Sequence, residues 1–151
     1  MLAMWKLYLD NCCFNRPFDD QSQLLVRLEM EAKLFIQKEI KNETFELVWS
    51  YILDIENDAN PYPRRKKSIL SWQSLAKIDV EESEELLLLM ESFEKRGLKP
   101  HDALHVAAAV VASADFFITV DRGILKKSIT EIRVMNPENF VRYYGGIENN
   151  E

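Results

Sequence analysis

The chain has 151 residues, of which 47% are hydrophobic and 29% charged, a composition that supports a packed core and excludes wholesale disorder. Its formal net charge of -6, from 25 acidic and 19 basic side chains, excludes a protein that coats nucleic acid through its bulk charge. A cluster of carboxylates around a divalent cation is compatible with that charge. We expect residues 1–151 to form a single domain, since neither a repeat nor a break in composition divides the sequence.

The cysteines and the first residues indicate where the protein is found. Cys12 and Cys13 are adjacent and have no other thiol to pair with, which favours a reducing, intracellular setting. Each is expected to be a small core residue rather than a nucleophile. The sequence has neither a signal-peptide pattern at its start nor an apolar run of about 20 residues, so we expect a cytoplasmic protein without membrane contact.

The first half of the chain predicts strands that alternate with helices. The apolar run Trp5–Leu9 predicts a strand, and Asp10-Asn11 after it is a turn or cap signal. Apolar residues three or four apart predict an amphipathic helix from Asp20 to about Lys41, capped by Asp19, Asp20 or Ser22. The other elements expected here are a strand at Phe45–Trp49, a helix from Ser50 through Glu56, a helix over Arg64–Leu75 and a brief strand at Ala76–Val80.

The second half continues the alternation. A helix is predicted over Glu81–Lys95, stopped by Arg96-Gly97, and Pro100 begins another helix that ends near Ser113. Phe116–Val120 is uniformly apolar, which is typical of a parallel strand buried on both faces. The last expected elements are a short helix after Asp121, a strand at Ile132–Met135 and a helix around Glu138–Tyr144. Strands separated by helices predict an α/β fold, with helices on both faces of a mainly parallel central sheet.

Acidic residues stand where such a sheet places its ligand site, in the crevice beyond the carboxyl ends of the strands. Asp10 follows the first strand, Asp121 follows the later apolar strand, and Asp102 lies in the first turn of a helix. Asp54 and Glu56 lie on the helix after the second strand. Clustered carboxylates repel one another unless a cation compensates, and Mg²⁺ and Mn²⁺ prefer oxygen ligands. The pattern therefore indicates a metal site suited to phosphodiester hydrolysis.

Each acid also has a structural interpretation when it is taken singly. Asp10 is a plausible Asx-turn residue or helix cap, and Asp102 is an acid favoured by the helix dipole. Asp121 is suited to cap the helix that contains Ile124. Acids at corresponding places on separate elements are harder to explain in this way, but composition and spacing alone leave both interpretations open.

Four blocks of the sequence resemble the ordered signature of PIN domains. They are Leu7-Tyr8-Leu9-Asp10, PHDALHVAAA at 100–109, ADFFITVD at 114–121 and VMNPE at 134–138. The resemblance runs from residue 5 to about 144, and 102–121 is its most specific part. It implies a three-layer α/β/α PIN-like fold and a Mg²⁺- or Mn²⁺-dependent endoribonuclease. Many bacterial and archaeal members, VapC-type proteins among them, are the toxin halves of toxin–antitoxin pairs.

The resemblance also assigns roles to single positions. The acids that it implies in metal binding and catalysis are Asp10, Glu56, Asp102 and Asp121. Asp54 remains an alternative to Glu56, because the register of that helix is open. Thr119 matches a family hydroxyl near the metal. Asn11 stands where many members carry Thr or Ser, a departure that concerns substrate positioning and leaves the metal ligands intact.

Basic residues flank the expected site. Four of them follow the Pro-rich turn: Arg64, Arg65, Lys66 and Lys67. They form either a solvated helix face or a patch that contacts RNA phosphates, assisted by Arg122 and Lys126-Lys127.

Other classes of function stay open at this point. His101 and His105 are spaced like the zinc ligands of a protease helix, but the sequence has no further His to complete that site. His105 is expected instead to pack or hydrogen-bond within the helix layer, with His101 near the rim. A PIN-like, non-catalytic module that binds a protein or RNA partner is the main alternative to the ribonuclease.

The apolar segment Leu86–Met90 bears on the partners. It is more apolar than one helix face requires and is expected to be core. The alternative is a surface for a homodimer or for an antitoxin helix. The partners that we expect are an RNA substrate, an antitoxin protein and a second copy of the chain.

Overall fold

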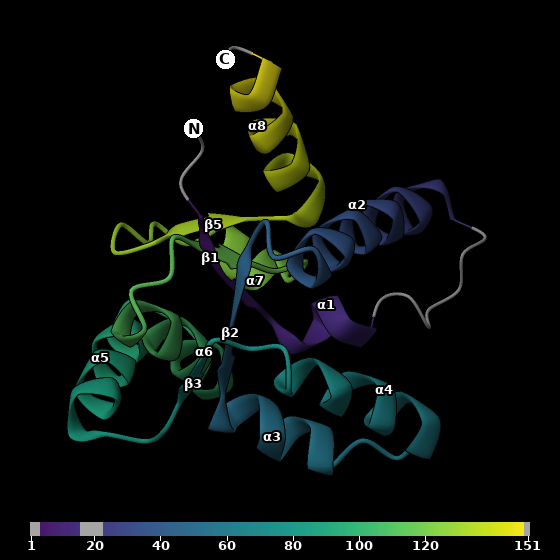
Figure 1. Ribbon diagram of the computed structural model, residues 1–151. Helices are drawn as coiled ribbons and strands as arrows, with labels where there is room; N and C mark the ends of the chain where they lie inside the picture. The colour runs from purple at the N-terminus through teal and green to yellow at the C-terminus, as the bar shows by residue number, and fades with distance from the viewer. Residues whose placement is uncertain (1–3, 16–22, 150–151) are drawn as a thin grey trace.

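The computed structural model describes residues 4–15 and 23–149 (Figure 1). The strands in this part of the chain are β1 (Lys6–Leu9), β2 (Glu46–Ser50), β3 (Ile78–Val80), β4 (Phe116–Ile118) and β5 (Arg133–Met135). They form one sheet in the order β3-β2-β1-β4-β5, and every neighbouring pair is parallel. The prediction of a mainly parallel sheet is therefore confirmed.

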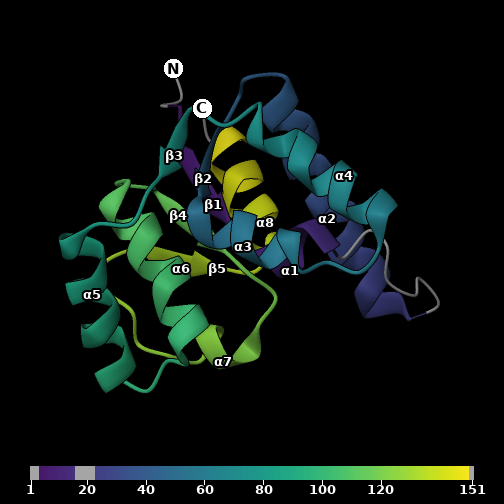
Figure 2. The same cartoon turned by 90° about the horizontal axis from the view of Figure 1, so that it is seen from below.

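Helices cover both faces of this sheet. They are α1 (Asn11–Asn15), α2 (Leu24–Lys41), α3 (Tyr51–Asp58), α4 (Pro63–Gln73), α5 (Glu84–Lys95), α6 (Pro100–Val111), α7 (Arg122–Leu125) and α8 (Pro137–Asn149). In Figure 2, α5 and α6 lie together on one side of the strands, whereas α2 and α8 lie on the other. The fold is thus a three-layer α/β/α arrangement, as expected.

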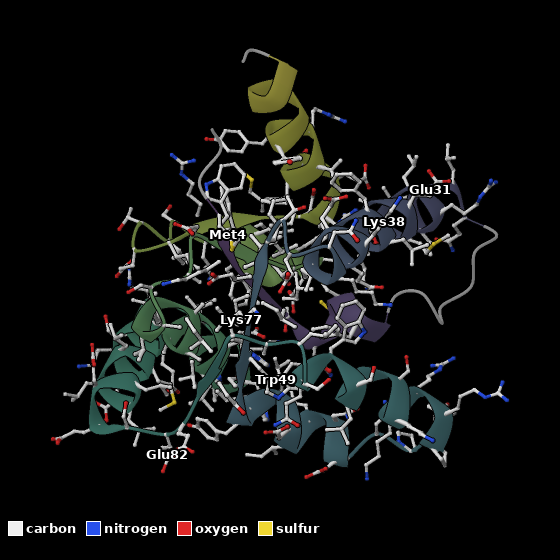
Figure 3. All side chains as sticks on the ribbon, viewed as in Figure 1. Met4, Glu31, Lys38, Trp49, Lys77 and Glu82 are labelled. Atoms are coloured by element: carbon white, nitrogen blue, oxygen red, sulfur yellow. The ribbon has the colours of Figure 1, made fainter. Side chains whose placement is uncertain are left out.

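Burial of the central strand explains its uniformly apolar sequence. Leu7, Tyr8 and Leu9 are all 2% exposed or less, because helices cover the sheet on both faces. On α2 the charged side chains of Glu31 and Lys38 point outward (Figure 3), whereas Lys33 is buried with Ile36 and Ile40. The alternation of outer polar and inner apolar residues holds these helices on the sheet.

Most differences from the predicted elements are shifts of a few residues at their ends. The amphipathic helix is confirmed as α2, whereas its predicted beginning and the caps Asp19, Asp20 and Ser22 lie outside the described residues. Ser50 caps α3 by accepting a hydrogen bond from Leu53 N at 3.4 Å. The helix α1 was not predicted, since Asn11 was interpreted as part of a turn. Burial of Cys13 and Phe14 holds this five-residue helix in place.

The apolar segment on α5 is only partly core. Leu86 is fully buried, as expected, but Leu88 is 59% exposed. In the described part of the chain, no helix has both the length and the apolar character that a membrane crossing requires.

The topology places a crevice beside β1. The chain passes from β1 to β2 on one side, and only β4 returns to pair with β1 on the other side. Ligands of open α/β sheets bind at such a switch point, beyond the carboxyl ends of the strands. Leu9 of β1 is in register with Ile118 of β4, so Asp10 and Thr119 leave the sheet side by side.

Candidate functional site

Asp10 lies at the floor of this crevice and is only 7% exposed. Its backbone N–H donates to Ile118 O at 2.9 Å, which continues the pairing of β1 with β4. The Thr119 hydroxyl donates to Asp10 Oδ2 at 2.8 Å, and Asn11 N–H donates to Oδ1 at 2.8 Å. Donors on both oxygens fix the orientation of the carboxylate.

Asp121 is linked to Asp10 through the same hydroxyl. Its backbone N–H donates to Thr119 Oγ1 at 3.0 Å, while its own carboxylate caps α7 by accepting from Gly123 N at 2.7 Å. A Cβ at position 123 would lie 3.0 Å from Asp121 Oδ1, so Gly123 permits this close approach. The structural interpretation of Asp121 as a cap is therefore correct, and it is compatible with a place in the crevice.

Asp102 lies in the first turn of α6, and its electrostatics show which groups it faces. Burial, together with the negative charges of Asp121 and Asp10, raises the pKa of Asp102 above its ordinary value. His105 and Lys99 oppose that shift. Three of the predicted acids thus share one electrostatic environment, in which their ionised forms repel each other.

The structure separates the two alternatives on α3. Glu56 Oε1 is hydrogen-bonded to His105 Nε2 at 2.7 Å. The same ring nitrogen lies 3.8 Å from Asp10 Oδ1. Asp54 instead accepts from the indole of Trp49, with a distance of 3.0 Å between Nε1 and Oδ1. Glu56 is therefore the acid of α3 that lies beside Asp10.

A buried chain of hydrogen bonds leads from Glu56 through His105 into the sheet. His105 Nδ1 lies 2.7 Å from the Tyr8 hydroxyl, which in turn lies 2.6 Å from Ser50 Oγ. Neutral His105 accepts from Tyr8 while donating to Glu56; protonated His105 donates to both, and Tyr8 then donates to Ser50. The chain is satisfied in either state, because each hydroxyl can reverse its direction.

The charge around His105 favours its protonated form. Burial lowers the pKa of His105, but the Glu56 hydrogen bond and the charges of Asp10, Glu56 and Asp102 outweigh it and raise the pKa above its ordinary value. The zinc-protease alternative does not fit this arrangement. Both ring nitrogens of His105 already have partners, and His101 is exposed at the rim as expected.

Both cysteines are free thiols. Cys13 is buried and donates to Ile118 O at 3.3 Å, in agreement with its expected place in the core. Cys12 is only half-buried, and its Sγ lies 3.5 Å from Asp10 Oδ2 and 3.7 Å from Thr119 Oγ1. Cys12 therefore lies beside the Asp10 carboxylate.

The predicted basic residues are not all gathered at the crevice. Arg65 lines a cavity of about 400 Å³ together with Glu56 and Asn11. Lys126 and Lys127 line a different cavity, next to Phe93 and Arg96 between α5 and α7. The remaining basic candidates on α4 and α7 are on the surface or partly so: Arg64, Lys66, Lys67 and Arg122.

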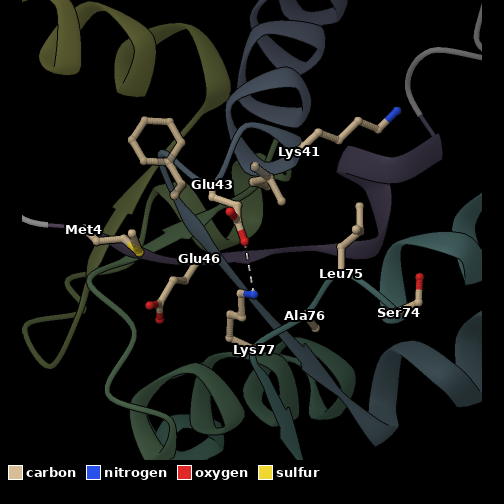
Figure 4. Close-up of a pocket in the computed structure, with 10 residues that line it drawn as sticks. Met4, Lys41, Glu43, Glu46, Ser74, Leu75, Ala76 and Lys77 are labelled. Carbon is tan, nitrogen blue, oxygen red and sulfur yellow. Dashed lines mark hydrogen bonds and ion pairs between the residues drawn. The ribbon is translucent and has the colours of Figure 1, made fainter.

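A second cavity of about 400 Å³ lies at the other end of the sheet, near the amino end of β2 (Figure 4). Its charged groups include Glu46, Lys77 and Glu43, and the last two form an ion pair at 3.5 Å (Figure 4). None of the acids at the switch point lines it. We therefore place the candidate functional site at the carboxyl ends of β1 and β4.

The donors at this site suit a hard divalent cation. Carboxylate oxygens dominate, and a cation would relieve the repulsion by Asp121 and Asp10 that adds to burial in raising the pKa of Asp102. Among the described residues, no three Asp, Glu, His or Cys side chains stand in a ready-made ligand set. The acids thus fit a metal by the chemistry of their oxygen donors.

Comparisons with known proteins identify the fold. No protein-family model matches the chain, and no curated protein sequence does. A chain from the crystal structure of VapBC2 from Rickettsia felis, bound to a DNA fragment from the promoter, matches with a TM-score of 0.58 and 14% identity, covering 87% of this chain and 98% of that chain. A chain of DNA-bound VapBC from Salmonella typhimurium matches at 0.55 and 14%, covering 89% and 99%. These similarities establish a shared fold.

Proposed function

From the PIN-like fold that the chain has in common with these structures, we propose that it is a divalent-metal-dependent endoribonuclease that hydrolyses RNA phosphodiester bonds. The observation that carries this proposal is the convergence of Asp10, Asp102 and Asp121 at the switch point of the sheet. There, the charges of Asp121 and Asp10 add to burial in raising the pKa of Asp102. A binding module has no need to hold repelling carboxylates together.

The proposed ligands of Mg²⁺ or Mn²⁺ are Asp10, Glu56, Asp102 and Asp121. When bound, such an ion lowers the pKa of a coordinated water and stabilises the leaving oxygen. Thr119 and the backbone of Asn11 keep Asp10 oriented, and His105 keeps Glu56 beside it. Arg65, on the cavity that Glu56 also lines, supplies positive charge for an RNA phosphate.

The proposed partners follow from the same fold. The matched structures are VapBC toxin–antitoxin complexes, so we propose that this chain is the toxin of such a pair and binds an antitoxin protein. Its proposed location is the cytoplasm, where RNA substrates are found. We also propose a homodimer as the form of the free protein, and the exposed Leu88 on α5 is the position at which to test it.

The test of the proposed function is cleavage of a mixed RNA pool by the purified protein. We expect cleavage with Mg²⁺ or Mn²⁺, none with EDTA, and none with metal for Asp10→Asn. A folded wild-type protein that cuts no RNA in either metal, and that gives no calorimetric signal of Mn²⁺ binding, would exclude the nuclease and favour the binding module.

A second prediction compares the two acids of α3. Glu56→Gln is expected to reduce cleavage about 10- to 100-fold, because it weakens a proposed metal ligand held by His105. Asp54→Asn is expected to remain within about threefold of wild type, since its amide oxygen can still accept from Trp49. Initial rates at saturating Mg²⁺ measure both. The reverse order would assign the second acid to Asp54.

A further inference from the structure

The cavity beside Glu56 has the composition of a nucleotide site. Its lining consists of Asn11, Glu56, Ala59, Asn60, Pro61, Tyr62 and Arg65. Its volume of about 400 Å³ is within the range of small-ligand pockets. An aromatic ring, a guanidinium and amides together are the groups with which proteins hold single-stranded RNA. Because Glu56 is one of the proposed metal ligands, the cavity opens directly beside the proposed site of cleavage.

Tyr62 is the aromatic group of this cavity, and it is 56% exposed. The Arg65 guanidinium carbon lies 4.6 Å from the centre of its ring, so one face of the ring is covered by a cation. An aromatic side chain with that much exposed surface, next to an acidic crevice, leaves room for a base to stack on it.

Prolines and hydrogen bonds restrict the backbone around Tyr62. Tyr62 N–H donates to Asn60 Oδ1 at 3.0 Å, and Pro61 and Pro63 limit the backbone on either side. Tyr62 O accepts from Lys66 N at 2.9 Å, in the first turn of α4. A restricted backbone lowers the conformational entropy that is lost when a base stacks on the ring.

Asn11 lines the same cavity and follows Asp10 directly in the sequence. Its Oδ1 atom is buried and accepts no hydrogen bond from any residue that the structure describes. Because this atom is closed to solvent, a nucleotide in the cavity reaches the side chain only if the amide turns. Asn11 therefore places an amide group where the cavity adjoins the first acid.

We propose that this cavity binds the unpaired RNA nucleotide next to the cleaved phosphodiester, with its base stacked on Tyr62 and its phosphate on Arg65. The inference rests on the proposed function, since it names a substrate subsite of the same nuclease. It also makes the enzyme selective for single strands, because a base inside a duplex is already stacked on its neighbours.

Binding of a fluorescent ten-nucleotide RNA without secondary structure tests the subsite, measured by anisotropy with Mg²⁺ in an Asp102→Asn background so that the RNA stays intact. Tyr62→Ala is expected to raise the Kd about 5- to 100-fold, whereas Tyr62→Phe keeps the ring and stays within about threefold. The Kd of an RNA duplex should be the same with Tyr62 and with Ala at that position. Thermal unfolding verifies that each variant is folded.

Arg65→Ala tests, in the same binding assay, whether the Arg65 guanidinium contacts an RNA phosphate. It is expected to weaken binding and to lower the slope of log Kd against log salt by about one, since it removes one phosphate contact. Arg27→Ala, an exposed arginine on α2, is the matched control and should leave both quantities unchanged. An unchanged slope for Arg65→Ala would remove this residue from the subsite.

The outcomes separate this inference from the proposed function. Equal Kd values with Tyr62 and with Ala at position 62, or no binding of the single strand by folded protein, would overturn the subsite whether or not the enzyme cuts RNA. Binding that depends on Tyr62, in a wild-type protein that cuts no RNA in any metal, would support the subsite and contradict the nuclease.

Discussion

In EDTA at neutral pH, Asp102→Asn is expected to unfold at a higher temperature than the wild-type protein and, with metal restored, to have lost RNA cleavage. Burial and the charges of Asp121 and Asp10 raise the pKa of Asp102 in the folded protein, so its ionised form destabilises the metal-free fold. Asparagine removes that charge at nearly constant shape. The rise in Tm is on the order of 1–3 °C, because partly exposed charge pairs are weak. Cleavage should fall by at least about 100-fold.

The pH dependence of this effect has a definite sign. A carboxyl whose folded pKa is raised contributes stability below its unfolded pKa and loses it as pH rises through the folded value. The Tm difference between variant and wild type should therefore grow from acid to neutral pH in EDTA. Saturating Mg²⁺ should reverse the order, since only wild type keeps the full set of acids. Differential scanning calorimetry across this range measures both, and a variant that is less stable in EDTA at every pH would contradict the repulsion.

His105→Ala is expected to be the most destabilising single change at the site. It removes a buried side chain that contacts both Tyr8 and Glu56, and it leaves a cavity with the Tyr8 hydroxyl short of a partner. The expected loss is about 2–4 kcal/mol, or roughly 5–15 °C in Tm for a chain of this size. His101→Ala is the matched control. His101 is exposed and lies four residues earlier on α6, so the Tm of His101→Ala should differ little from that of the wild-type protein.

A pH series distinguishes the charge of His105 from its packing. The neighbouring carboxylates raise its folded pKa, so the stability that it contributes is complete below its unfolded pKa of about 6.5. That contribution is lost as pH rises through the higher folded value. In EDTA, the Tm gap between wild type and His105→Gln should be wider at pH 5.5 than at pH 8.5. A gap that is constant with pH would mean that His105 acts through packing alone.

The sequence predicted the elements that have strong local signals. The apolar runs of β1 and β4, the Ser50 cap and the stop of α5 at Gly97, whose φ of 99° suits glycine, each depend on a few neighbouring residues. The helix α1 lacks such a signal, because NCCFN contains no strong helix former and is held by tertiary packing. The sequence therefore offers only the turn or cap signal of Asp10-Asn11 at this point and predicts no helix.

Parts of the site depend on contacts that no local pattern encodes. Asp54 and Glu56 are two residues apart and point to different sides of α3, so only the packing of that helix decides which one lies beside Asp10. The hydrogen bond between Tyr8 and His105 joins residues 97 positions apart. Sequence analysis placed His105 within the helix layer, whereas it connects that layer to the sheet and to α3. The expected hydrogen bonding of His105 is confirmed, but its partners Tyr8 and Glu56 are distant in the sequence and have no local signal.

The hydrogen bond between Thr119 and Asp10 joins residues separated by 109 positions, and it has a consequence during synthesis. While β4 is still inside the ribosome, Asp10 has already left the tunnel without the Thr119 hydroxyl that donates to it. Asp121 has not yet emerged at that stage. Messages that are truncated before this point therefore yield products without the proposed active site. If the chain is the proposed nuclease, its activity appears only after the residues through Asp121 have left the tunnel and β4 has paired with β1.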